Sequence, residues 1–259
     1  MSFHGIYMND ALKYFNRENY RRALELFLEN LENATTDDER AYNANLAGLC
    51  LYFLHYPDEA LNYFNIALEN SQGEENDKVQ NNIDEVNRFV ERIKEDIENI
   101  KSKLEGEDDK RKRGILLSNL GLLHYFIGMR DEAEKNYDEA EKIFKILRDN
   151  IALGAVYSNR AMLYDDMRQL DYLYRALDIF EKEGHLKGQV DTLHSLSLYY
   201  LDDDYIEEAY YFLNKELKIL ENVDDKELKR RAYELAGDIA MEMGNVEEAM
   251  KYTERASQL

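Results

Sequence analysis

The sequence predicts an all-α fold built from stacked pairs of antiparallel helices. Small residues recur twelve positions apart, and an apolar or aromatic residue usually follows four positions after the second one. The five pairs of small residues are Ala11/Ala23, Gly48/Ala60, Gly121/Ala133, Ser197/Ala209 and Gly237/Ala249. Small side chains at these offsets let two helices approach closely, and a period of about forty residues is typical of stacked copies of one helix pair.

Six such units are predicted along one continuous domain of residues 1–259. They lie near residues 4–35, 41–70, 114–149, 154–184, 190–224 and 227–259. In the second unit Pro57 stands where the second helix begins, a place where its missing N–H is not needed. The third unit turns at Gly128. In the fourth, the small residue after Ala161 is Ala176, fifteen positions on, and if Ala176 fills the last small position of the unit, we expect a shortened turn between its helices.

One long helix is predicted near residues 76–105, between the second and third units. No Gly or Pro occurs from Glu75 to Glu105, and apolar residues recur there in steps of three and four. They are Ile83, Val86, Val90, Ile93, Ile97, Ile100 and Leu104. Such a seam either packs along its own solenoid or pairs with a second copy as a coiled coil, and the pattern is compatible with both arrangements.

The charge of the chain limits its partners. With 54 acidic and 33 basic residues, the formal net charge is −21. This charge repels phosphate backbones and anionic lipid, so it argues against nucleic acid and membrane surfaces and favours a basic protein partner. The chain has no apolar stretch of the roughly 20 residues that a membrane span needs, and its first residues do not resemble a secretory signal, so we expect a cytoplasmic protein.

No pattern of catalytic or metal-binding residues is found. The five histidines lie more than four residues apart, and none is paired with the single cysteine, Cys50, at the spacing of metal ligands. The glycines are scattered rather than clustered in a phosphate-binding loop. The sequence therefore predicts no metal, no cofactor and no enzymatic activity.

The repeated pattern resembles the tetratricopeptide repeat (TPR). The closest match is the series Leu120, Gly121, His124, Gly128, Ala133, Tyr137 and Ala140. A second good match is the series Ala236, Gly237, Ala240, Gly244, Ala249 and Ala256. The resemblance implies a right-handed α-α superhelix, a TPR solenoid into which the long helix is inserted. Proteins similar to this usually bind peptides or partner proteins on a concave face lined by the first helix of each unit.

The resemblance also indicates candidate binding residues. In family members that hold extended peptides, an asparagine two positions before the first small residue bonds the ligand backbone, and Asn119 and Asn159 match it. Ser195 takes this position in a later unit, next to His194. An amide suits the task because it both donates and accepts, although a solvated asparagine on a helix face is the alternative.

The segment Ser158-Asn159-Arg160-Ala161 looks like part of the carboxylate clamp of chaperone-binding members. The neighbouring units lack the basic residues of that clamp, so we do not expect this function.

Three functions remain open. The first is a scaffold that binds a peptide or helix of a partner protein. The second is a structural homo-oligomer, joined through the seam of residues 83–104 or through the C-terminal helix. The third is a regulatory peptide receptor.

Overall fold

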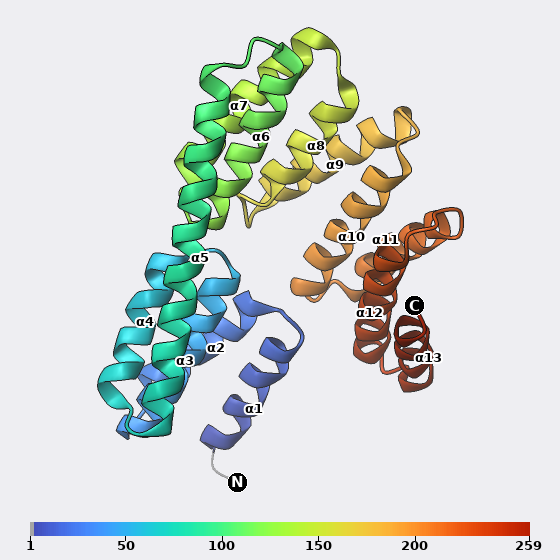
Figure 1. Ribbon diagram of the computed structural model, residues 1–259. Coiled ribbons are helices and arrows are strands. Elements are labelled where there is room, and N and C mark those ends of the chain that lie inside the picture. The colour runs from blue at the N-terminus through green and yellow to red at the C-terminus, as the bar shows by residue number, and fades with distance from the viewer. Residues whose placement is uncertain (1–2) are drawn as a thin grey trace. The chain divides into compact units, whose positions relative to one another are not determined.

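The computed structural model describes residues 3–259, which form thirteen helices and no strand (Figure 1). The predicted all-α repeat class is confirmed. Twelve helices form six consecutive pairs: α1 (Phe3–Asn16) and α2 (Tyr20–Glu32), α3 (Asp37–Phe53) and α4 (Pro57–Asn70), α6 (Lys110–Phe126) and α7 (Arg130–Leu147), α8 (Asn150–Ala161) and α9 (Met167–Lys182), α10 (Leu186–Asp202) and α11 (Ile206–Leu220), and α12 (Lys226–Glu242) and α13 (Val246–Ser257). The remaining helix is the long α5 (Glu74–Glu105). None of the helices in this range is long and apolar enough to cross a bilayer.

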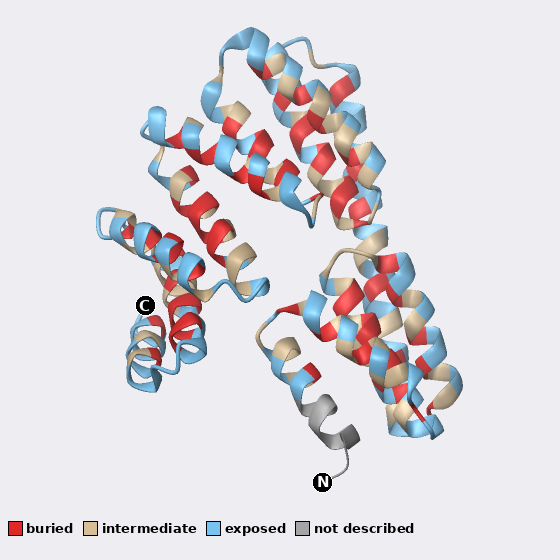
Figure 2. Cartoon of the chain, turned by 180° about the vertical axis from the view of Figure 1, so that it is seen from behind, coloured by how far each residue is buried: buried red, intermediate tan, exposed pale blue. Residues whose placement is uncertain are grey.

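The chain divides into two compact units. The first contains residues 1–107 and 119–133, and the second contains residues 108–118 and 134–259. The division runs through α6 and α7, which contribute residues to both units. In each unit the buried residues lie mainly along the facing sides of neighbouring helices (Figure 2). The single continuous domain remains a prediction.

The pair α3 and α4 packs through a small residue that faces a large ring. In the first unit, a Cβ atom added at Gly48 of α3 would lie 2.7 Å from the ring of Phe64 in α4. Phe64 is fully buried, together with Ala60 and Ala67 of the same helix. Gly48 therefore has the role that the sequence predicts for the repeated small residues, because a larger side chain there would hold the two helices apart.

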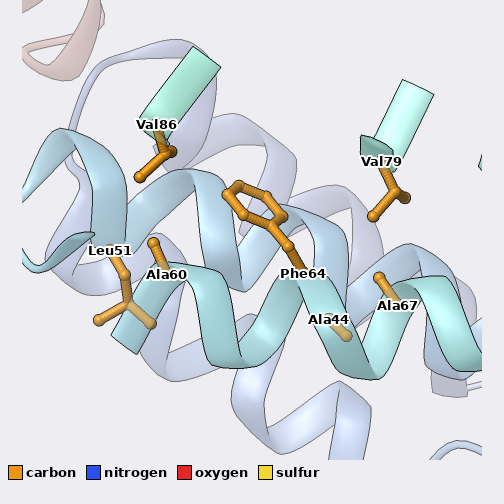
Figure 3. Close-up of a cluster of buried hydrophobic side chains, with 7 residues drawn as sticks. All are labelled: Ala44, Leu51, Ala60, Phe64, Ala67, Val79 and Val86. Carbon is orange, nitrogen blue, oxygen red and sulfur yellow. The ribbon is translucent and has the colours of Figure 1, made fainter. Parts of the chain in front are cut away.

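The long helix packs on its own chain. Val79 and Val86 of α5 belong to the same core cluster as Phe64, and Figure 3 shows them on either side of its ring, with their side chains directed toward α4. Ile83 and Val90 are partly buried against this cluster. The other seam residues are buried within the chain (Ile93, Ile97, Leu104) or half-buried (Ile100). The sequence left open whether the seam packs on its own chain or pairs with a second copy, and in the structure it packs on its own chain.

Five of the hairpins share one turn. Three residues join the two helices, and the middle one has a positive φ: Glu18, His55, Gly128, Asp204 and Gly244. The next residue donates its backbone N–H to a carbonyl five residues earlier, as Tyr56 does to Leu51 at 2.9 Å and Tyr205 does to Tyr200 at 2.8 Å. This is the Schellman motif, which satisfies the last carbonyl groups of a helix. Tyr56 and Tyr205 therefore occupy equivalent positions.

The fourth hairpin differs from the expectation. Its turn, residues 162–166, is longer than the others, and the shortened element is α8, with 12 residues against 17 in α10 and α12. The prediction of a shortened turn is wrong because both helix starts are fixed by caps. Asp149 accepts the N–H of Ala152, and Asp166 accepts the N–H of Arg168. The missing residues therefore come from the end of α8.

Candidate functional site

The first helices of the second unit form a layer of neighbours. Helix α8 contacts α10, and α10 contacts α12, while each also packs on the second helix of its own pair. In the register of the repeat, Asn159 of α8, Ser195 of α10 and Leu235 of α12 hold the same position. Leu235 is buried, so only Asn159 and Ser195 offer polar groups at this position.

Asn159 is the candidate with free hydrogen-bonding capacity. It is half-buried, and its amide makes no hydrogen bond with any residue described in the structure. The hydroxyl of Ser195 is also half-buried, but it donates to the backbone carbonyl of Asp191 at 3.1 Å. A half-exposed amide without a partner keeps both a donor and an acceptor for a ligand.

Asn119 lies on α6, in the part of that helix that belongs to the first unit. Its residue is exposed, and its amide also has no partner among the residues described. Asn119 stays a predicted partner-binding residue of that unit.

His194 is an interior residue. It is buried, and its Nδ1 lies 3.1 Å and 3.2 Å from the two carboxylate oxygens of Glu216, which is fully buried in α11. The pair links α10 to α11, and the imidazole is not presented to solvent. Sequence reasoning missed Glu216, although a glutamate among the apolar positions Leu213 and Leu220 of α11 was a signal.

A partly exposed ion pair connects α10 and α12. Arg231 donates to Asp191 at 2.7 Å, and both side chains are about 40% exposed. Pairs of this exposure contribute about 0–1 kcal/mol to stability. Their charges are, however, accessible to a ligand that lies along these helices.

Arg160, beside Asn159, is held by carboxylates of α7. Its guanidinium bonds Glu134, Asp138 at 2.8 Å and Glu141 at 2.8 Å, and its side chain is only 8% exposed. Burial disfavours the charge, but the bonds to Glu134 outweigh it and raise the pKa of Arg160. The guanidinium is already neutralised, so it is not available to the carboxylate of a peptide.

Reactive side chains in the interior are shielded. Burial lowers the pKa of His55 to about 4 and also lowers the pKa of His124. Burial raises the pKa of the Cys50 thiol to about 12. Over the part of the chain that the structure describes, no group of three His, Cys, Asp or Glu side chains could hold a metal ion.

Solved structures share the fold of this chain. Aspartyl phosphate phosphatase F from Bacillus subtilis is 16% identical with a TM-score of 0.57, over 99% of this chain and 74% of that one. BtubC from P. vanneervenii is 14% identical with a TM-score of 0.51, over 100% of this chain and 91% of that one. No protein-family model matches the chain, and no curated protein matches its sequence. The chain thus has a TPR-like helical repeat fold.

Proposed function

We propose that this protein is a binding scaffold that holds a peptide segment or helix of a partner protein along the first helices of its repeat pairs. In the second unit this surface is formed by α8, α10 and α12. The proposal depends on one observation above all, the half-buried amide of Asn159, which has no partner among the described residues.

The chemistry of this surface suits a polypeptide. A backbone peptide unit needs one acceptor and one donor, and an asparagine amide supplies both in any sequence context. Asp191 and Arg231 lie on the neighbouring helices and can exchange their mutual bond for charged groups of a ligand. The net charge of −21 favours a partner with a basic binding segment.

The proposed role is non-enzymatic. The name of the B. subtilis neighbour is that of a phosphatase, but at 16% identity the likeness concerns the fold. We propose no phosphatase activity for this chain, and its cytoplasmic location also stays a prediction. A regulatory peptide receptor is the same proposal with a free peptide as the ligand.

Quantitative affinity capture tests the proposal. Wild-type protein and the Asn159→Ala variant are immobilised at equal density, and co-purifying proteins are measured by mass spectrometry. We expect one or a few partners to fall several-fold with Asn159→Ala, and Asn119→Ala tests the first unit in the same way. Asn87→Ala is the matched control, because Asn87 is an exposed asparagine on α5. Equal recovery from all variants would refute the proposed surface.

A homo-oligomer is the second candidate function. The observation that favours it lies in the last helix pair. Large apolar side chains are exposed around the turn between α12 and α13: Met241, Met243, Val246 and Met250. Self-association through this surface would cover them. Light scattering decides the question, because association should disappear in a Met250→Glu variant, whereas a monomeric wild type rules the oligomer out.

A further inference from the structure

The second unit carries a cluster of aromatic side chains, three of which are exposed. We call it the tyrosine patch, and it consists of Tyr174, Tyr200, Tyr205, Tyr211 and Phe212. These residues come from α9, α10, α11 and the turn between α10 and α11. The hydroxyl oxygens of Tyr174 and Tyr200 lie 2.9 Å apart, and the ring of Tyr200 stacks on Phe212 at 5.4 Å.

The rings form one continuous cluster, in which Phe212 is buried and the outer tyrosines are open to solvent. Every member has a ring contact with Tyr200 or Phe212 at centroid distances of 5.1–6.3 Å. Three rings remain largely exposed, with relative accessibilities of 42% for Tyr174, 56% for Tyr205 and 55% for Tyr211. Tyrosine is enriched at the centres of protein interfaces because it offers a rigid apolar area with one polar end.

Acidic residues without ionic partners lie close in sequence to two of the exposed rings, Tyr205 and Tyr211. Asp203 and Asp204 precede Tyr205 directly, and Glu207 and Glu208 lie one helical turn before Tyr211. All four are exposed, and none forms an ion pair with the residues that the structure describes. The ammonium of Lys215 lies 4.7 Å from the ring centre of Tyr211 and forms no ion pair with these carboxylates.

An equivalent tyrosine in the first unit shows what such a ring can hold. Tyr56 occupies the same turn position as Tyr205, and the guanidinium of Arg130 lies 4.3 Å from the centre of its ring. Arg130 is the first residue of α7, and the corresponding first residue of α13 is Val246. The sequence therefore provides no arginine at the position that would cover Tyr205.

We infer that the tyrosine patch is a docking surface for an arginine-containing basic segment of a partner protein, with one guanidinium stacked on Tyr205. The aromatic face attracts the cation, and Asp203, Asp204, Glu207 and Glu208 supply carboxylates for its hydrogen bonds. Anionic partners are repelled by the same four carboxylates. The inference does not depend on the role proposed for Asn159.

Fluorescence anisotropy tests the inference. The probe is a fluorescein-labelled peptide in which arginine alternates with serine, and the reference probe has citrulline at each arginine position. Because a cation–π contact and the surrounding charge each contribute, we expect Tyr205→Leu to weaken arginine-peptide binding about five-fold and Tyr205→Phe to preserve it. The citrulline peptide should bind far more weakly than the arginine peptide.

Matched charge variants separate this site from the general attraction of an acidic protein. Glu207→Gln/Glu208→Gln removes two charges from the second and third residues of α11, and Asp58→Asn/Glu59→Gln removes two from the same positions of α4. Both variants change the net charge equally, so Glu207→Gln/Glu208→Gln should weaken binding of the arginine peptide more than Asp58→Asn/Glu59→Gln does. Equal losses for both pairs, or no loss with Tyr205→Leu, would overturn the inference. Self-association abolished by Tyr205→Leu would also overturn it, because the occupant would then be a second copy.

Discussion

Among single residues, a buried charged side chain contributes more to the free energy of unfolding than an exposed one. Arg160 and Arg175 illustrate the difference. Arg160 is 8% exposed and bonds three carboxylates, whereas Arg175 pairs with Asp171 and both side chains are 53% exposed. Removing a buried partner leaves the remaining charges without compensation, but water replaces the partner of an exposed charge.

We therefore expect Arg160→Met to lower the free energy of unfolding by about 2–4 kcal/mol, because Glu134, Asp138 and Glu141 lose their shared cation. Urea unfolding followed by circular dichroism measures the change. Arg175→Met is the control and should alter the stability by no more than about 0.5 kcal/mol. Equal effects of the two variants would contradict the interpretation of Arg160 as an internal charge.

The same network predicts a dependence on pH. Burial would raise the pKa of Glu141, but hydrogen bonds from Lys145 and Tyr157, together with the charges of Lys145 and Arg160, outweigh burial and lower this pKa below its ordinary value of 4.5. A lowered folded-state pKa stabilises the fold above the ordinary value, and this stabilisation is lost as the pH falls through the folded value. The stability difference between wild type and Arg160→Met should therefore shrink below about pH 4.5. A constant difference down to pH 3 would contradict this role of the carboxylates.

Cys50 gives a second prediction at this scale. Its thiol is buried and its pKa is raised to about 12, so almost no reactive thiolate exists at neutral pH. Ellman's reagent should modify the folded protein only at the rate at which the protein opens, and should react at once in denaturant. An Asn87→Cys variant in a Cys50→Ala background is the exposed control and should react rapidly when folded.

The sequence pattern indicates which repeat position a polar residue occupies, but it does not show whether the side chain is buried or exposed. Asn119 and Asn159 were singled out by the TPR resemblance and stay predicted binding residues; their amides have no partners among the described residues. His194 holds the neighbouring position to Ser195, yet its ring is turned to the interior and meets Glu216. A one-residue step on a helix turns the side chain by about 100°, so the register alone does not separate the inner from the outer side.

At the scale of elements, the helix pairs could be predicted because small residues and turns recur at fixed offsets. Gly128 and Gly244 have positive φ where the pattern predicts a turn, and Pro57 begins α4. The shortened α8 could not be predicted. The sequence shows that this pair is shorter than the others, but whether the helix or the turn loses the residues depends on the caps Asp149 and Asp166.

Two glycines at the same repeat position should respond in opposite ways to alanine. At Gly237 of α12 an added Cβ would meet nothing closer than 3.5 Å, whereas at Gly48 of α3 it would lie 2.7 Å from the ring of Phe64. Gly237→Ala should raise the free energy of unfolding by about 0.5–1 kcal/mol through helix propensity. Gly48→Ala should lower it by about 1–2 kcal/mol, because the overpacked ring costs more than the propensity gains.

Thermal and urea unfolding of both variants test this pair of predictions. Gly244→Ala serves as a further control, since Gly244 has open space around it but a φ of +74°. Gly244→Ala should lower the free energy of unfolding through backbone strain alone. If Gly48→Ala and Gly237→Ala stabilised the protein equally, close approach of α3 and α4 would not be the reason for glycine at position 48.

For the whole molecule, the packing partner of the long helix α5 could not be predicted from the sequence. The apolar seam of α5 has the spacing of a coiled coil, and that spacing is the same whether the facing side chains belong to the same chain or to another. The structure places Val79 and Val86 against Phe64, so the partner is the chain itself. Only the arrangement of α3 and α4 beside α5 decides this, and that arrangement depends on contacts between residues distant in the sequence.

This arrangement predicts how a seam mutation responds to protein concentration. Val86 is 1% exposed, and Val86→Ala should lower the free energy of unfolding by about 2 kcal/mol through the cavity it leaves beside Phe64. Because the contact is intramolecular, the difference in unfolding midpoint between wild type and variant should be the same at about 1 µM and about 100 µM protein. Association through the last helix pair would shift both midpoints together and leave their difference unchanged. A difference that grew on dilution would instead mean that residues 83–104 join two chains, because the variant would then weaken the association itself.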